Sequence, residues 1–146
     1  YNLAVSDAEG QVEFSLLDIS GHNSMFPQST GDKRIKVDAV SLDNHIGNLT
    51  HIDVVKIDVE GAEPLVLKGM EKIINNNPNI KIIMEFAPSN LQRGGTNPID
   101  FIKTIRNYGF GIKLINESSG ELSGITDDEL SGVYSVNIVL QKENRA

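Results

Sequence analysis

The stretch "DVVKIDVEGAEPLVL" at residues 53–67 begins as a β-branched apolar run and then carries four charged residues. These are Lys56, Asp58, Glu60 and Glu63. Carboxylates in such a place can take a proton from a substrate or bind a cation such as Mg²⁺. An isolated charge inside a buried strand is costly, so this much charge at a strand end requires an explanation.

Two explanations account for these charges. In the first, Lys56 and Asp58 form an ion pair and neutralise each other. In the second, the strand has reached its carboxyl end and opens into a pocket, where open α/β sheets bind their ligands. Glu60 and Glu63 have a simpler interpretation, because carboxylates favour the positive N-terminal end of the helix that follows. Glu85 ends the next expected strand and either lines the same crevice or pairs with a lysine.

Apolar and alternating runs predict the strands that would position these residues. The first two runs, "NLAVS" and "QVEFSLL", flank a turn signal and can form a hairpin. The predicted strands cover residues 2–6, 11–17, 34–40, 52–58, 80–86, 110–115 and 134–140.

Helical spacing and end signals predict two long helices between the strands. Pro64 suits the first turn of one helix, whose apolar residues recur at helical spacing until the asparagines before Pro78. Asn97 can cap the other helix, which Pro98 opens and Gly109 closes. Both helices would pack an apolar face against the strands.

Shorter segments complete the prediction. Ser41 or Asp43 can cap a short helix that Gly47 ends. Residues 18–33 and 87–96 are predicted loops, and loops of this kind often carry function or shape a binding pocket.

The order of the elements predicts a single α/β domain over residues 1–146. Strands that alternate with helices imply a parallel sheet with helices on its faces. Near-continuous apolar strands such as "DVVKI" and "IKIIM" fit a sheet that is covered on both sides. The last two strands have no clear helix between them, so we expect a mostly parallel sheet with an antiparallel terminal strand at its edge.

The bulk composition argues against several classes of function. The net charge of −7 argues against a nucleic acid as partner, because phosphate binding needs clustered Lys and Arg. The chain has no Cys, which excludes disulfides, thiolate metal sites and a cysteine nucleophile. No apolar run approaches the roughly 18 residues that a membrane span needs. No signal peptide is visible either, so we expect a cytoplasmic protein.

The segment "KIDVEGAE", at residues 56–63, resembles the signature of the FkbM-type methyltransferases. The flanking segments "LAVSDAEGQVEF", "GHNSMF", "VDAVSLDNHI" and "IIMEFAP" resemble this family in order and spacing. The resemblance implies a Rossmann-like class I methyltransferase sheet. It also implies methyl transfer from S-adenosylmethionine to a hydroxyl of a sugar or natural-product acceptor.

The same resemblance implies roles for individual residues. Asp58 would lie nearest the transferred methyl, as a cofactor contact and as the base that takes the proton of the acceptor. Glu60 and Glu85 would be further catalytic residues that orient the acceptor and line the same crevice. Ser6 and Asp7 would contact the adenine of the cofactor, although Asp7 can equally begin a turn.

The resemblance further predicts parts of the family that this chain lacks. The glycine-rich cofactor loop and the ribose-binding acid of the family lie on two strands that would precede Tyr1. We therefore expect an N-terminally truncated methyltransferase sheet. The missing strands would leave an exposed sheet edge through which the chain could form a homo-oligomer.

Alternatives remain at this stage. A non-catalytic binding or assembly domain could keep the methyltransferase fold without binding the cofactor, and a carboxylate-rich sugar-binding domain is a third interpretation. We expect no metal, because the spacing of the carboxylates matches no metal-binding loop. His22 titrates near neutrality and could assist proton transfer, but a lone loop histidine is more often solvated.

Overall fold

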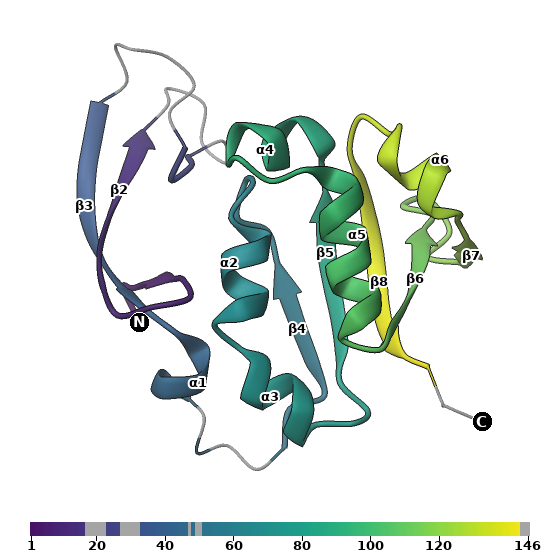
Figure 1. Ribbon diagram of the computed structural model, residues 1–146, viewed down its shortest axis with the longest axis horizontal. Helices are drawn as coiled ribbons and strands as arrows, with labels where there is room; N and C mark the ends of the chain where they lie inside the picture. Colours follow the sequence, from purple (N-terminus) through teal and green to yellow (C-terminus); the bar gives the residue numbers. More distant parts are fainter. Residues whose placement is uncertain (17–22, 27–32, 47, 49–50, 144–146) are drawn as a thin grey trace.

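The computed structural model describes residues 1–16, 23–26, 33–46, 48 and 51–143. The strands form a three-stranded and a five-stranded sheet, and Figure 1 shows the smaller sheet beside the helices that lie over the larger one. The strands are β1 (Ala4–Val5), β2 (Gly10–Leu16), β3 (Lys33–Val40), β4 (Val54–Ile57), β5 (Lys81–Phe86), β6 (Phe110–Ile115), β7 (Leu122–Gly124) and β8 (Val136–Lys142). The helices are α1 (Leu42–His45), α2 (Glu63–Lys68), α3 (Glu71–Asn76), α4 (Pro88–Arg93), α5 (Pro98–Asn107) and α6 (Asp127–Ser131).

The smaller sheet has the order β1-β3-β2. The predicted hairpin between the first two strands is therefore wrong, because β3 lies between them. β3 pairs in parallel with β1 and antiparallel with β2. The antiparallel pairing runs from Gly10↔Ala39 to Leu16↔Lys33, so β3 offers β2 seven paired positions, which the two-residue β1 could not match.

The larger sheet has the order β4-β5-β8-β6-β7. The pairing of β4 with β5 is parallel, and the three other pairings are antiparallel. The prediction of a mostly parallel sheet with an antiparallel edge is not confirmed. The terminal strand β8 is antiparallel as predicted, but it lies between β5 and β6 rather than at an edge. The strands β4, β5 and β6 all run in the same direction. Because β8 runs opposite to them and lies between β5 and β6, it makes two of the antiparallel pairings.

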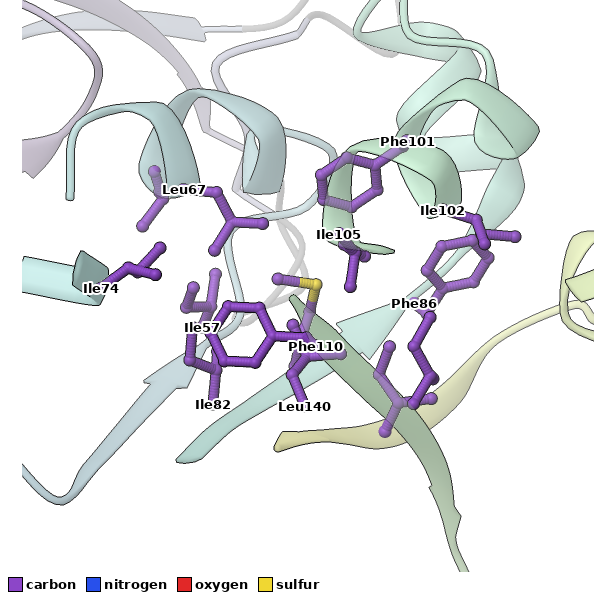
Figure 2. Close-up of a cluster of buried hydrophobic side chains, with 14 of the residues drawn as sticks. Ile57, Leu67, Ile74, Ile82, Phe86, Phe101, Ile102, Ile105, Phe110 and Leu140 are labelled. Carbon is purple, nitrogen blue, oxygen red and sulfur yellow. The ribbon is translucent and has the colours of Figure 1, made fainter. Parts of the chain in front are cut away.

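The helices cover one face of the larger sheet. Ile57, Ile82 and Met84 point to this face and are buried against α2, α3 and α5, as Figure 2 shows for the labelled Ile57 and Ile82 beside Leu67 and Ile74. The opposite face carries the alternate residues of the same strands, and these are partly or largely exposed. The predicted sheet covered on both sides is therefore wrong for β4 and β5 in the described part of the chain: the face of these two strands that carries charge is open.

The predicted helix from Pro64 to the asparagines before Pro78 is divided into α2 and α3. The break lies at Gly69, where a Cβ atom would approach the backbone oxygen of Ser6 to 2.1 Å. Asp43 completes the break: its backbone N–H donates to the oxygen of Gly69, and its carboxylate accepts the backbone N–H groups of Lys72 and Ile73 at the start of α3. Tertiary contacts thus end one helix and begin the next.

The segment 87–96, predicted as a loop, contains helix α4. Pro88 occupies its first turn, Leu91 is buried, and Gly94 and Gly95 follow its last residue. These are ordinary start and stop signals, and a loop prediction overlooked them. Within the described residues, none of the helices is long and apolar enough to cross a membrane.

The packing of α5 onto the sheet provides a test of the core. Phe101 is buried and stacks on Phe86 with 6.4 Å between ring centroids, whereas Ile99 on the same helix is 48% exposed. We expect Phe101→Ala to lower the free energy of unfolding by about 3–5 kcal/mol, because it removes a buried ring and leaves a cavity. Urea denaturation measures the change, and Ile99→Ala, the matched control, should change stability by under about 1 kcal/mol.

Candidate active site

The parallel register of β4 and β5 brings three carboxylates together. Ile57 pairs with Met84, so continuing both strands by one residue places Asp58 beside Glu85 on the open face. Glu60 follows in the turn after β4. Each of these three residues offers one carboxylate oxygen, and these oxygens lie within 4.8 Å of one another. The carboxyl ends of two adjacent strands thus form one acidic cluster.

A neighbouring donor holds each carboxylate of the cluster. The Nζ of Lys56 lies 2.9 Å from Oδ2 of Asp58, so the ion pair predicted from the sequence is present. Ser135, just before β8, donates its hydroxyl to Oε1 of Glu85 at 2.7 Å. Asn90 on α4 donates its amide to Oε2 of Glu60 at 2.8 Å. These contacts orient the cluster from three different elements of the fold.

The turn between β4 and α2 has an unusual backbone. Glu60 has a φ of 53°, the only positive φ of a residue other than Gly in the described part of the chain, and Gly61 has a φ of 104°. The Glu60 carbonyl accepts the hydroxyl of buried Ser24 at 2.9 Å and the Nη2 of Arg93 at 3.4 Å. A left-handed conformation costs a residue such as Glu about 1–2 kcal/mol, so surrounding contacts must hold the turn in place.

Glu63 begins α2, as one sequence interpretation proposed, but its side chain is buried, with 4% of the residue exposed. Its Oε1 accepts the backbone N–H of Gly61 at 3.2 Å, and its Oε2 has no hydrogen-bond partner. Burial raises the pKa of the Glu63 carboxyl, and backbone hydrogen bonds oppose that rise only in part. This residue therefore holds the turn through the Gly61 N–H, and the charge of Glu85 adds to the rise of its pKa.

The structure separates Ser6 and Asp7 from the cluster. The Oδ2 of Asp7 lies 2.8 Å from Nζ of Lys68, the last residue of α2, whereas the cluster lies at the start of that helix. The six residues of α2 span about 9 Å, at 1.5 Å per residue. The hydrogen bond from Lys68 lowers the pKa of Asp7. The predicted adenine contacts and the predicted base are thus at opposite ends of one helix.

Comparison with known families decides the class of protein. A family model described as the methyltransferase FkbM domain matches residues 1–112. The chain belongs to the FkbM methyltransferase family. It matches no curated protein and no solved structure. The match includes the whole turn from Asp58 to Glu63 and Glu85, but it ends before β7, α6 and β8.

A groove of this FkbM domain lies beside the edge strand β4, and none of the three cluster carboxylates is among its lining residues. Its volume is about 380 Å³, and its walls come from β4, from Val5, and from α1, α2 and α3. Lys56 is the one charged residue among the groove's lining residues. Such an apolar groove does not offer the polar groups that a ribose or an amino-acid group needs.

Sequence reasoning identified the carboxylates of the FkbM domain and Lys56 as the partner of Asp58. It missed Ser24, which holds the Glu60 carbonyl, and Asn90 and Ser135, which hold the carboxylates of Glu60 and Glu85. Ser24 lies in the serine segment that resembles the family, so its position gave a signal. Asn90 and Ser135 gave none, because their partners are 30 and 50 residues away along the chain. His22 lies outside the described residues.

The turn at Gly61 gives a prediction about local strain. A Cβ atom at Gly61 would lie 2.3 Å from the backbone oxygen of Asn90, whereas a Cβ at Gly95, which has a φ of 80°, would meet nothing within 4 Å. We expect Gly61→Ala to cost about 3 kcal/mol, the sum of left-handed strain and overpacking. Gly95→Ala introduces only the left-handed backbone strain, without a clash, and should lower the free energy of unfolding by about 1–2 kcal/mol. Chemical denaturation measures both variants, and equal losses of stability in Gly61→Ala and Gly95→Ala would contradict the close packing of α4 on the turn.

Glu63 gives a prediction about pH. Because burial raises the pKa of its carboxyl in the folded state above the ordinary value of 4.5, its stabilising contribution is present below the unfolded pKa. That contribution is lost as the pH rises through the folded pKa. We expect Glu63→Gln, which mimics the protonated acid, to gain stability relative to the native chain between about pH 4.5 and neutral pH.

Urea denaturation from pH 4 to pH 8 measures this difference. The control is Glu13→Gln, because Glu13 is exposed on β2. If the stability of the native chain and that of Glu63→Gln change with pH in the same way, the Glu63 carboxyl titrates alike in the folded and unfolded states. That result would contradict the prediction.

Proposed function

We propose that this chain takes part in methyl transfer from S-adenosylmethionine to a hydroxyl of a sugar or natural-product acceptor. The observation that carries the proposal is the cluster of Asp58, Glu60 and Glu85 at adjacent strand ends, within the region that matches the FkbM model. Open α/β sheets bind ligands outside the carboxyl ends of their strands, which is where this cluster lies. The open sheet face leaves the cluster accessible to an acceptor.

The chemistry of the cluster suits a cationic methyl donor. Three carboxylates offer oxygens within 4.8 Å of one another, with two cations beside them: the Lys56 ammonium on Asp58 and the Arg93 guanidinium on the Glu60 carbonyl. Acidic groups that outnumber the bases favour a sulfonium nearby. The role of Ser6 and Asp7 as contacts of the adenine stays a prediction: they lie at the far end of α2, and the adenine and the sulfonium are at separate parts of the cofactor. Bound S-adenosylmethionine would supply an electrophilic methyl group. Among the described residues, we assign Asp58 to the contact with its sulfonium.

Asp58 is our candidate general base. Lys56 holds Oδ2 of the carboxylate, and we assign Oδ1 to accept the proton of the acceptor hydroxyl. The hydroxyl oxygen would bond to the methyl carbon while the bond from that carbon to the sulfonium sulfur breaks, and its electron pair would return to sulfur. Such a base must approach the hydroxyl to roughly 2.6–3.2 Å. Glu60 and Glu85 would accept hydrogen bonds from the acceptor and align that hydroxyl with the methyl group. Alignment of this kind supplies a large part of the acceleration in a transfer reaction.

The proposed base gives a direct prediction. We expect Asp58→Asn to lower kcat by about 100-fold or more, since it keeps the shape of the side chain but removes the proton acceptor. The measurement is transfer of a labelled methyl group from S-adenosylmethionine to a panel of methyl glycosides of hexoses and deoxyhexoses. Asp100→Asn is the matched control, because Asp100 is exposed on α5 and forms an ion pair with Lys103.

Unchanged turnover in Asp58→Asn would reject Asp58 as the base. The absence of methyl transfer by the native chain to every glycoside of the panel would reject the proposed acceptor class. The expectation that the reaction needs no metal stays a prediction, which addition of EDTA to the same assay tests.

The edge position of β4 favours a second candidate function, an assembly domain. In the part of the chain that the structure describes, no strand pairs with the outer edge of β4, and Val54 on that strand is 54% exposed. Unpaired strand edges can pair with another copy of the chain. Sedimentation of the native chain and of Val54→Lys tests this function: a dimer that the charge converts to a monomer would support it, and a native monomer would reject it.

A further inference from the structure

Asn90 lies on α4, 30 residues along the chain from the carboxylate that its side chain contacts. Its Nδ2 donates to Oε2 of Glu60 at 2.8 Å. We propose that Asn90 is a positioning residue, which fixes the Glu60 carboxylate in the orientation that binds the acceptor hydroxyl. This inference rests on the proposed function and deepens it, because it names the residue that sets the alignment of the acceptor.

The backbone of Glu60 is the first observation in favour. Its φ of 53° lies in the left-handed region, which residues other than Gly, Asn and Asp seldom adopt. A glycine would adopt this φ without strain but would bring no carboxylate to the cluster. Strained backbone of this kind persists where the surrounding structure holds it, and it gathers at functional sites. A Glu at a position where Gly would relieve the strain therefore indicates that the Glu60 side chain has a role.

The division of contacts around Glu60 is the second observation. Ser24 and Arg93 hold its backbone carbonyl, at 2.9 Å and 3.4 Å, and so fix the turn. Asn90 contacts the carboxylate itself. The backbone contacts keep the turn in place, whereas the amide of Asn90 sets the direction of the charged group. These two tasks can be separated by mutation.

The close packing of α4 is the third observation. The backbone oxygen of Asn90 lies so near Gly61 that a Cβ atom there would approach it to 2.3 Å, and a Cβ at Gly94 would lie 2.8 Å from the oxygen of Gly61. The helix that carries the amide is thus fixed against the turn that carries the carboxylate. A hydrogen bond between two such rigid elements holds its geometry without a large loss of side-chain freedom.

The experiment is a double-mutant cycle on methyl transfer to the panel of methyl glycosides. We expect Asn90→Ala to lower kcat/KM for the acceptor about tenfold, since hydrogen bonds to charged groups are among the stronger ones. In the Glu60→Ala background, which has no side-chain oxygen for Asn90 to orient, Asn90→Ala should have no further effect, because the two residues act as one unit. Gln92→Ala, an exposed amide on the same helix, is the control and should leave kcat/KM and Tm unchanged.

A second measurement does not depend on activity. The carboxyl-carbon NMR signal of Glu60 should shift in Asn90→Ala and stay in place in Gln92→Ala. An unmoved signal in Asn90→Ala, or equal losses of kcat/KM in both backgrounds, would overturn the positioning role. If the native chain transfers no methyl group, the proposed function fails, and the NMR signal still decides whether Asn90 orients Glu60.

Discussion

The parallel pairing of β4 with β5 is the constraint on which the rest of the site depends. The register Ile57↔Met84 directs Ile57 into the helical layer, and its continuation directs Asp58 and Glu85 to the opposite face. Side chains alternate along a strand, so the set that faces the helices and the set that carries the charge lie on opposite faces of the sheet. The apolar core and the acidic cluster are therefore two results of the same register. Charge at the end of an apolar strand is tolerable here because its face of the sheet is open.

The turn that follows β4 joins this register to the remaining elements. Ser24 reaches the Glu60 carbonyl and exchanges backbone hydrogen bonds with Ser15 of β2, so the turn connects the smaller sheet to the larger one. Asn90 and Arg93 attach α4 to the same turn. Buried Glu63 accepts the N–H of Gly61 and costs stability when it is charged, because burial raises its pKa. The fold thus concentrates strain and unfavourable burial within a few residues of the cluster, a distribution typical of functional sites.

Local signals in the sequence predicted much of this arrangement. The apolar run before Asp58, the Ser41 and Asn97 caps and the Lys56–Asp58 pair all follow from short-range chemistry, and the structure has them. Long-range contacts decided the rest. β8 enters the sheet between β5 and β6, and Gly69 is held against Ser6, which divides a helix whose own residues favour continuity. The residues adjacent to a strand do not determine its place in the sheet, and the residues adjacent to Asn90 do not determine its hydrogen-bond partner.

The separation between the two faces of the sheet is the central claim, and a high-resolution crystal structure of the protein tests it most directly. The measured quantity is the set of distances among the carboxylate oxygens of Asp58, Glu60 and Glu85. Our account predicts one oxygen from each within 4.8 Å of the others, on the sheet face opposite α2 and α5. A one-residue shift between β4 and β5 would turn Asp58 toward the helices and separate it from Glu85. That result would contradict the account.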